Sequence, residues 1–203
     1  MSQQFPPSEG LDHVHRDGFM IPVQIYSQWT PNPNAYKFIV SETVMNEGKA
    51  TFSSDKPHEY ESIALVKNLL NIPNVIQVHL FENVITVTQD GDSDWADLSD
   101  TVEGVITDSM SQHNPEIAIA KPARKKHASP DLEKIEEILD RTVRPALQGD
   151  GGDVEVVDLI DGVLTIRYEG ACGTCPSSLA GTLNAITSFV HDEFDPNIEV
   201  VAI

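Results

Sequence analysis

Two cysteines, Cys172 and Cys175, are the only thiols in the 203-residue chain, and they are the side chains best suited to chemistry. They lie close together in the stretch EGACGTCPSSLAGT, which runs from Glu169 to Thr182. Thiolates ligate soft metals and attack disulfides. A tetrahedral metal site or a common iron–sulfur cluster needs about four ligands. The pair therefore supplies only half of such a site.

The residues around the pair favour reactive thiols over structural ones. Gly170 and Gly173 keep side-chain bulk low beside the sulfurs. Pro176 is expected at the first position of a helix, which would place Cys175 at the N-cap and Cys172 just outside it. The positive end of the helix dipole would then favour the thiolate form.

Three interpretations fit such a pair. The first is a dithiol–disulfide oxidoreductase, because CGTC at a helix start is similar to a thioredoxin-type motif. Against it, a hairpin leads into the cysteines, no Trp precedes Cys172, and the region is short for that fold. The second is a zinc site within one chain, but His191 is expected some 20 Å away along a helix. The third is a four-thiolate site shared by two chains, which suits an iron–sulfur cluster or a zinc ion.

Before the cysteine region, the sequence predicts a domain of mixed helices and strands. Alternating apolar residues predict strands, and apolar residues at helical spacing predict helices. The stretch TPNPN, Thr30–Asn34, predicts a turn because it is rich in Pro and Asn. The expected elements are strands at 20–29 and 35–42, a helix at 60–72, strands at 74–81 and 84–89, and a helix whose apolar face runs over 95–106, with residues 92–94 offering its N-terminal cap.

After residue 130 the expected order is helix, strand, strand, cysteine loop, helix, strand. Ser129 is a predicted N-cap, and Pro145 should end or kink the helix that follows. Asp161–Gly162 is a strong hairpin signal between the first two strands. The stretch GDGGD, Gly149–Asp153, is interpreted as a tight turn whose aspartates cap it or face solvent.

A basic segment separates the two halves of an acidic chain. The chain carries a net charge of -19, yet residues 121–130 hold four basic and no acidic groups. The segment is also rich in Ala and Pro, which predicts a flexible linker. We therefore expect an α+β protein with two small mixed domains joined by a flexible linker. Its predicted parts are a polar tail at 1–20, a domain at 21–113, the linker at 114–130 and a domain at 131–203.

Composition excludes several classes of partner. The acidic balance, with 13 basic against 32 acidic residues, argues against nucleic-acid binding, because phosphate contacts need clustered Lys and Arg. No apolar run approaches the ~20 residues of a membrane span. The first ten residues resemble neither a secretory signal nor an Arg-rich transit peptide. Together with closely spaced reduced thiols, these features predict a cytoplasmic protein.

The stretch LQGDGGDVEVVDLIDGVLTIRYEGACGTCPSSLAGT, residues 147–182, resembles the C-terminal domain of NifU-like, or Nfu-type, iron–sulfur cluster proteins. The matching features are DGGD at 150–153, the hairpin, GACxxCPSS at 170–178 and the helix after it. Upstream, TPNPNAYKF at 30–38 resembles the N-terminal domain that accompanies this module in many Nfu proteins. The two resemblances cover most of residues 22–203.

The resemblance implies a homodimer that bridges one [4Fe–4S] cluster through Cys172 and Cys175 of both chains. It implies a scaffold or carrier, not an enzyme, which accepts a cluster from upstream assembly proteins and delivers it to apo-proteins. Recognition of clients or donors is the expectation for the N-terminal domain. The thioredoxin-like oxidoreductase stays as the alternative.

Overall fold

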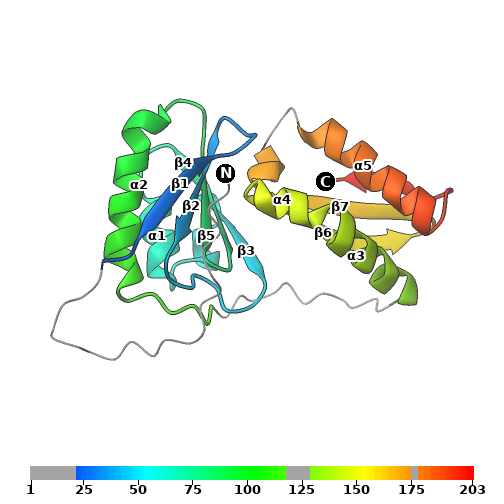
Figure 1. Ribbon diagram of the computed structural model, residues 1–203, viewed down its shortest axis with the longest axis horizontal. Helices are drawn as coiled ribbons and strands as arrows, with labels where there is room; N and C mark the ends of the chain where they lie inside the picture. Colours follow the sequence, from blue (N-terminus) through cyan, green and yellow to red (C-terminus); the bar gives the residue numbers. More distant parts are fainter. Residues whose placement is uncertain (1–21, 118–128, 175–177) are drawn as a thin grey trace.

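The computed structural model describes residues 22–117, 129–174 and 178–203 (Figure 1). They form two modules, each with its own sheet and apolar core: the N-terminal module, 22–117, and the C-terminal module, from 129 on. Both mix helices and strands, so the α+β class is confirmed. The predicted tail and most of the predicted linker lie outside the described residues.

The N-terminal module is a five-stranded antiparallel sheet in the order β1-β2-β5-β4-β3. Two α-helices and a short 3-10 helix complete it. Its elements are β1 (Ile25–Trp29), β2 (Ala35–Val40), β3 (Lys49–Ser53), η1 (Pro57–Glu59), α1 (Ala64–Leu70), β4 (Val75–Phe81), β5 (Val84–Gln89) and α2 (Trp95–Met110).

Along each strand, apolar and polar side chains alternate, so the sheet has one apolar face and one polar face. Figure 1 shows α1 and α2 on the side of the sheet that faces away from the C-terminal module. Apolar strand residues such as Phe38, Val78 and Ile85 pack with helix residues in one core. The other face is polar: one row of partners across four strands consists of Thr51, His79, Thr86 and Lys37. We call it the polar sheet face.

Strand β3 was not among the predicted elements. The sequence predicts two strands, a helix, two strands and a helix in this module, whereas a third strand precedes α1 in the structure. β3 is only five residues long and lies at the edge of the sheet. Its alternation rests on two residues, Ala50 and Phe52, so its periodic signal is weak.

The C-terminal module has a three-stranded sheet in the order β6-β7-β8, with β6 and β7 antiparallel and β7 and β8 parallel. Helices α3, α4 and α5 share one apolar core with this sheet. Its elements are α3 (Pro130–Thr142), α4 (Arg144–Gly149), β6 (Gly152–Ile160), β7 (Val163–Gly170), η2 (Ala171–Thr174), α5 (Ser178–Glu193) and β8 (Glu199–Ala202).

Three short sequence signals in this module have the structural effect that the sequence predicts. The Ser129 side chain accepts hydrogen bonds from the first turn of α3. The predicted break at Pro145 is confirmed, because α3 ends at Thr142 and Pro145 lies in the first turn of α4. Asp161 and Gly162 have φ of 50° and 80°, which is the pair of left-handed residues that a tight two-residue hairpin needs.

Strand β7, helix α5 and strand β8 form a strand–helix–strand unit in which the two strands are parallel. Cys172 lies in η2, in the connection between β7 and α5. A thioredoxin-type motif is expected in a strand–helix–strand context, so this arrangement does not count against the oxidoreductase, whereas the predicted hairpin before Cys172 is confirmed by the antiparallel pairing of β6 and β7. Within the described residues, no helix is both long enough and apolar enough to cross a membrane.

Candidate thiolate site

Cys172 lies in η2, directly after strand β7, and its side chain is buried at 6% exposure. It packs in the apolar core of the C-terminal module with Tyr168 and its neighbours. Cys175 and Pro176 lie outside the described residues, so the predicted N-cap position of Cys175 stays a prediction. The structure thus places one of the two predicted ligands, at the junction of a strand and a helix.

Two neighbours define the surroundings of the Cys172 sulfur. A Cβ atom at Gly152 would lie 2.4 Å from Sγ of Cys172, so only glycine leaves room for the sulfur there. Burial, reinforced by the negative charge of an ionised Cys172, raises the pKa of Tyr168 to about 12. Tyr168 therefore remains a neutral phenol beside the thiol at physiological pH.

No second set of ligands surrounds this thiol in the part of the chain that the structure describes. There, no group of three or more His, Cys, Asp or Glu residues could hold a metal ion. His191 lies near the end of α5, where Nε2 is 2.7 Å from the carbonyl oxygen of Ile198. That contact anchors β8 to α5, and it gives His191 a structural role.

The turn TPNPN of the other module lies against the cysteine region. Nδ2 of Asn32 donates a hydrogen bond to the carbonyl oxygen of Ala171, 2.9 Å away and next to Cys172. Asn32 is 1% exposed. Nε2 of Gln77, on β4, donates to the carbonyl of Gly170 at 3.0 Å. Two side chains of the N-terminal module therefore hold consecutive carbonyls just before Cys172.

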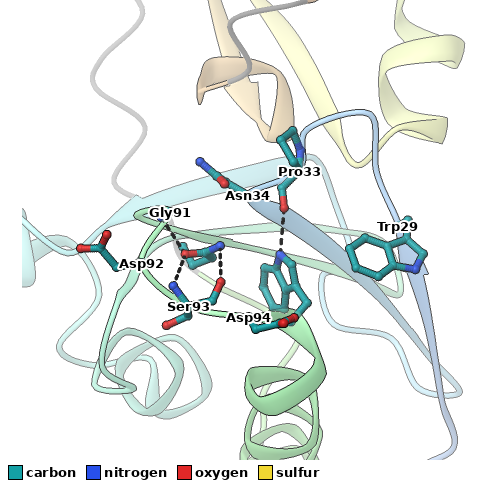
Figure 2. Close-up of a pocket in the computed structure, with 9 residues that line it drawn as sticks. Trp29, Pro33, Asn34, Gly91, Asp92, Ser93 and Asp94 are labelled. Carbon is teal, nitrogen blue, oxygen red and sulfur yellow. Dashed lines mark hydrogen bonds between the residues drawn. The ribbon is translucent and has the colours of Figure 1, made fainter.

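The turn that carries Asn32 is held in place by Trp95. Nε1 of Trp95 donates to the carbonyl of Pro33 at 3.2 Å, as Figure 2 shows. The Trp95 ring stacks on Tyr36 with centroids 5.1 Å apart. A surface pocket beside the turn is lined by Trp29, Pro33, Asn34, Gln89, Gly91, Asp92, Ser93, Asp94 and Trp95 (Figure 2).

Lys49 carries the charge contacts between the modules. Its Nζ lies 2.8 Å from Asp153 and 2.9 Å from Glu169, and it donates to the carbonyl of Val154 at 3.0 Å. Asp153 is 1% exposed and also lies 3.5 Å from Nε of Arg144. The prediction that the GDGGD aspartates cap the turn or face solvent is therefore wrong for Asp153, which is a buried ion-pair partner.

Burial shifts the titration of several groups at this contact. Desolvation lowers the pKa of His79 to about 4, and the nearby Lys49 charge lowers it further while Asp153 opposes the shift. Desolvation also lowers the pKa of Lys37, whose Nζ donates to the carbonyl of Gly149 at 2.6 Å. Burial raises the pKa of Glu169 against the opposing effect of Lys49.

The strand residues of the N-terminal module that make this contact could not be identified from the sequence. Lys37, Lys49, His79 and Thr86 alternate with core residues along their strands, which is the pattern of a solvent-facing sheet side. The only available signal was the TPNPN turn, which was noted without a chemical role.

Comparisons with known proteins cover both modules. The family described as "Scaffold protein Nfu/NifU N terminal" matches residues 25–113, and the family described as "NifU-like domain" matches residues 135–201. The second match includes the cysteine region.

Three relatives share similarity over most of the chain. The human protein "NFU1 iron-sulfur cluster scaffold homolog, mitochondrial" is 30% identical over 93% of this chain and 78% of its own length. The Drosophila persimilis protein of the same name is 28% identical over 87% of this chain and 64% of its own length. "NifU-like protein 4, mitochondrial" of Arabidopsis thaliana is 32% identical over 76% and 56%. The chain thus spans about half to three quarters of these relatives.

The names of these relatives overturn one prediction. All three are mitochondrial proteins, so the prediction of a cytoplasmic location is wrong and the comparison points to mitochondria. The physical reason is that reduced thiols exclude only oxidising compartments. A CxxC pair therefore does not distinguish the cytoplasm from another reducing compartment.

Proposed function

Because the chain belongs to the NifU-like, Nfu-type family of iron–sulfur cluster scaffold proteins, we propose that it binds a [4Fe–4S] cluster between two copies and transfers it to apo-proteins. The family is one of scaffolds and carriers rather than catalysts. The cluster is therefore cargo, and the partners are upstream assembly proteins and apo iron–sulfur clients.

The number of thiols supports a shared site. The chain has two cysteines, and common iron–sulfur clusters are held by about four thiolates. Among the described residues, no group of three or more His, Cys, Asp or Glu side chains could hold a metal ion. Two chains related by a two-fold axis would supply Cys172 and Cys175 twice, which completes the set.

The position of the ligands favours carriage over storage. Cys172 lies at a turn between strand and helix, and each chain would hold only half of the cluster. Client thiolates can then replace the ligands one at a time, and separation of the two chains completes the release. Within this proposal, residues 131–203 form the cluster-binding domain, 114–130 the linker and 21–113 the accompanying domain.

The dithiol oxidoreductase remains the second candidate, because the strand–helix–strand unit around Cys172 favours it. Family membership weighs toward the carrier. The two candidates predict different products: the carrier becomes coloured and dimeric with iron and sulfide, whereas the oxidoreductase stays colourless and cycles its dithiol against a disulfide substrate.

The test is anaerobic reconstitution with ferrous iron and sulfide, followed by iron and sulfide analysis. The wild-type protein should hold about four iron and four sulfide per two chains. Cys172→Ser should lose most of this cluster and of its transfer to an apo-protein, whereas Arg167→Ala should retain both. Arg167 is the matched control, since it lies on β7 and pairs with Glu155 at 2.9 Å at the surface. Full loading and transfer by Cys172→Ser would contradict the proposal.

A further inference from the structure

We propose that the polar sheet face of the N-terminal module, together with Asn32, is a binding surface for the segment from Gly149 to Cys172 of the same chain, and that it holds Cys172 in its buried position until a cluster is loaded. The occupant of this surface is thus the segment from Gly149 to Cys172. The inference deepens the proposed function, and its statement about cluster loading rests on it.

Four side chains of the N-terminal module donate hydrogen bonds across this contact. Among the described residues, side-chain donors of the N-terminal module reach four main-chain carbonyls of the C-terminal module. Asn32 donates to Ala171, Lys37 to Gly149, Lys49 to Val154 and Gln77 to Gly170. Lys49 adds ion pairs with two carboxylates. Side-chain donors on a sheet face that meet main-chain acceptors of a loop make the two surfaces complementary.

The glycines of the C-terminal module permit the close approach. A Cβ atom at Gly151 would lie 2.8 Å from Oγ1 of Thr86, and one at Gly170 would lie 3.0 Å from the His79 ring. Both opposing side chains belong to the polar sheet face, and they are 1% and 2% exposed. The DGGD turn and the glycine of EGAC therefore fit the N-terminal module, in addition to shaping their own backbone.

The contact buries polar groups that a solvent-facing sheet would leave in water. Thr86 and Thr88 are each 1% exposed, and their hydroxyls have no hydrogen-bond partner in the described part of the chain. Burying unpaired hydroxyls has a cost, which the ion pairs and carbonyl contacts must offset.

The buried position of Cys172 and its role as a ligand of a shared cluster exclude each other. A shared cluster must approach the sulfur from outside and bring a second chain with it. The Cys172 side chain is 6% exposed because it packs in the core of its own module, and the carbonyls of the two residues before it are held by Asn32 and Gln77. Loading therefore requires that the cysteine region leave the polar sheet face, which links cluster binding to separation of the modules.

The test is the alkylation rate of Cys172 in the full, reduced, cluster-free chain, followed by peptide mass spectrometry. Gly151→Ala should raise that rate about tenfold, because its methyl group collides with Thr86. Gly162→Ala is the matched control: Gly162 has the same φ of 80° as Gly151, but nothing lies within 4 Å of its Cβ position. It carries the same backbone strain without the collision, so its rate should equal that of the wild type.

Three further variants make the assignment specific. Thr86→Ala combined with Gly151→Ala should restore slow alkylation, because it removes the atoms that the methyl group meets. Asn32→Ala should accelerate alkylation several-fold, whereas Asn34→Ala, in the same turn but beside Gly91, should not. Equal rates for Gly151→Ala and Gly162→Ala, or no rescue by Thr86→Ala, would overturn the proposal.

Measuring the alkylation rate of Cys172 at several protein concentrations shows whether the same chain or a second copy occupies the surface. Protection by the same chain is independent of dilution, whereas protection that rises with concentration would assign the surface to a second copy and overturn the proposal. The readout needs no cluster. If reconstitution fails while the alkylation rates are as predicted, the binding surface is supported and the carrier function is contradicted. If reconstitution succeeds while the alkylation rates are not as predicted, only the binding surface is contradicted.

Discussion

At the scale of single residues, His79 makes the stability of the fold depend on pH. Its pKa is lowered from 6.5 to about 4 by burial, with Lys49 on β3 and Asp153 on β6 as the charges that face it. The unfolded chain therefore binds a proton between these values that the folded chain does not. The stabilisation is present above pH 6.5 and is lost as the pH falls toward 4.

We expect the free energy of unfolding to fall by about 2 kcal/mol from this residue between pH 7.5 and pH 5. Urea unfolding at the two pH values measures it. His79→Gln should flatten this part of the pH dependence, since Gln does not titrate and can still face Thr51, whose Oγ1 lies 2.8 Å from Nδ1 of His79. An unchanged pH dependence in His79→Gln would contradict the assignment.

Gly152 is the residue whose size matters most beside the thiol. A Cβ atom there would lie 2.4 Å from Sγ of Cys172 and 2.8 Å from its amide nitrogen. Because backbone cannot give way easily, Gly152→Ala should lower the free energy of unfolding by about 1–3 kcal/mol. Gly104→Ala is the control on α2, where nothing lies within 4 Å, and it should raise stability by up to about 1 kcal/mol. Equal effects in urea unfolding would refute this packing argument.

At the scale of elements, the cap of α3 is a direct test of local structure. Oγ of Ser129 accepts hydrogen bonds from the amides of Asp131 at 3.2 Å and Leu132 at 3.3 Å. Ser129→Ala should therefore lower the free energy of unfolding by about 1 kcal/mol. The control is Ser188→Ala, an exposed serine inside α5, which should leave thermal stability the same or slightly higher. No loss in Ser129→Ala would show that α3 does not depend on its cap.

Elements with strong local signals could be predicted from the sequence, and elements without them could not. The hairpin at Asp161–Gly162, the break at Pro145 and the cap at Ser129 each follow from one or two residues with a fixed backbone preference. Strand β3 has no such residue, and its pairing with β4 is a tertiary contact. The parallel pairing of β7 with β8 likewise depends on distant residues.

At the scale of the whole molecule, the candidate site could be predicted only in part. The chemistry of the two cysteines and the need for a second chain follow from ligand counting. The contact between the modules does not, because Lys49, His79 and Thr86 have the alternation of solvent-facing strand residues. Their burial comes from another surface of the chain, which no local pattern records.

At this scale, Lys49 links the two modules through its ion pairs with Asp153 and Glu169. Lys49→Met removes both interdomain ion pairs, while Asp153 keeps its contacts with Arg144 and Gln148. We expect faster amide hydrogen exchange in the region of Gly149–Cys172, with exchange in α2 unchanged. The control is Lys67→Met, whose only ion pair among the described residues is with Glu61 at 3.8 Å on the surface. Exchange that accelerates equally in both variants would contradict a specific role for Lys49.

The central claim is that one cluster is held by two chains, and native mass spectrometry of the anaerobically reconstituted protein tests it most directly. The account predicts a species of two chains plus one [4Fe–4S] cluster, which Cys172→Ser does not form. A cluster or a zinc ion retained by a single chain would contradict the claim.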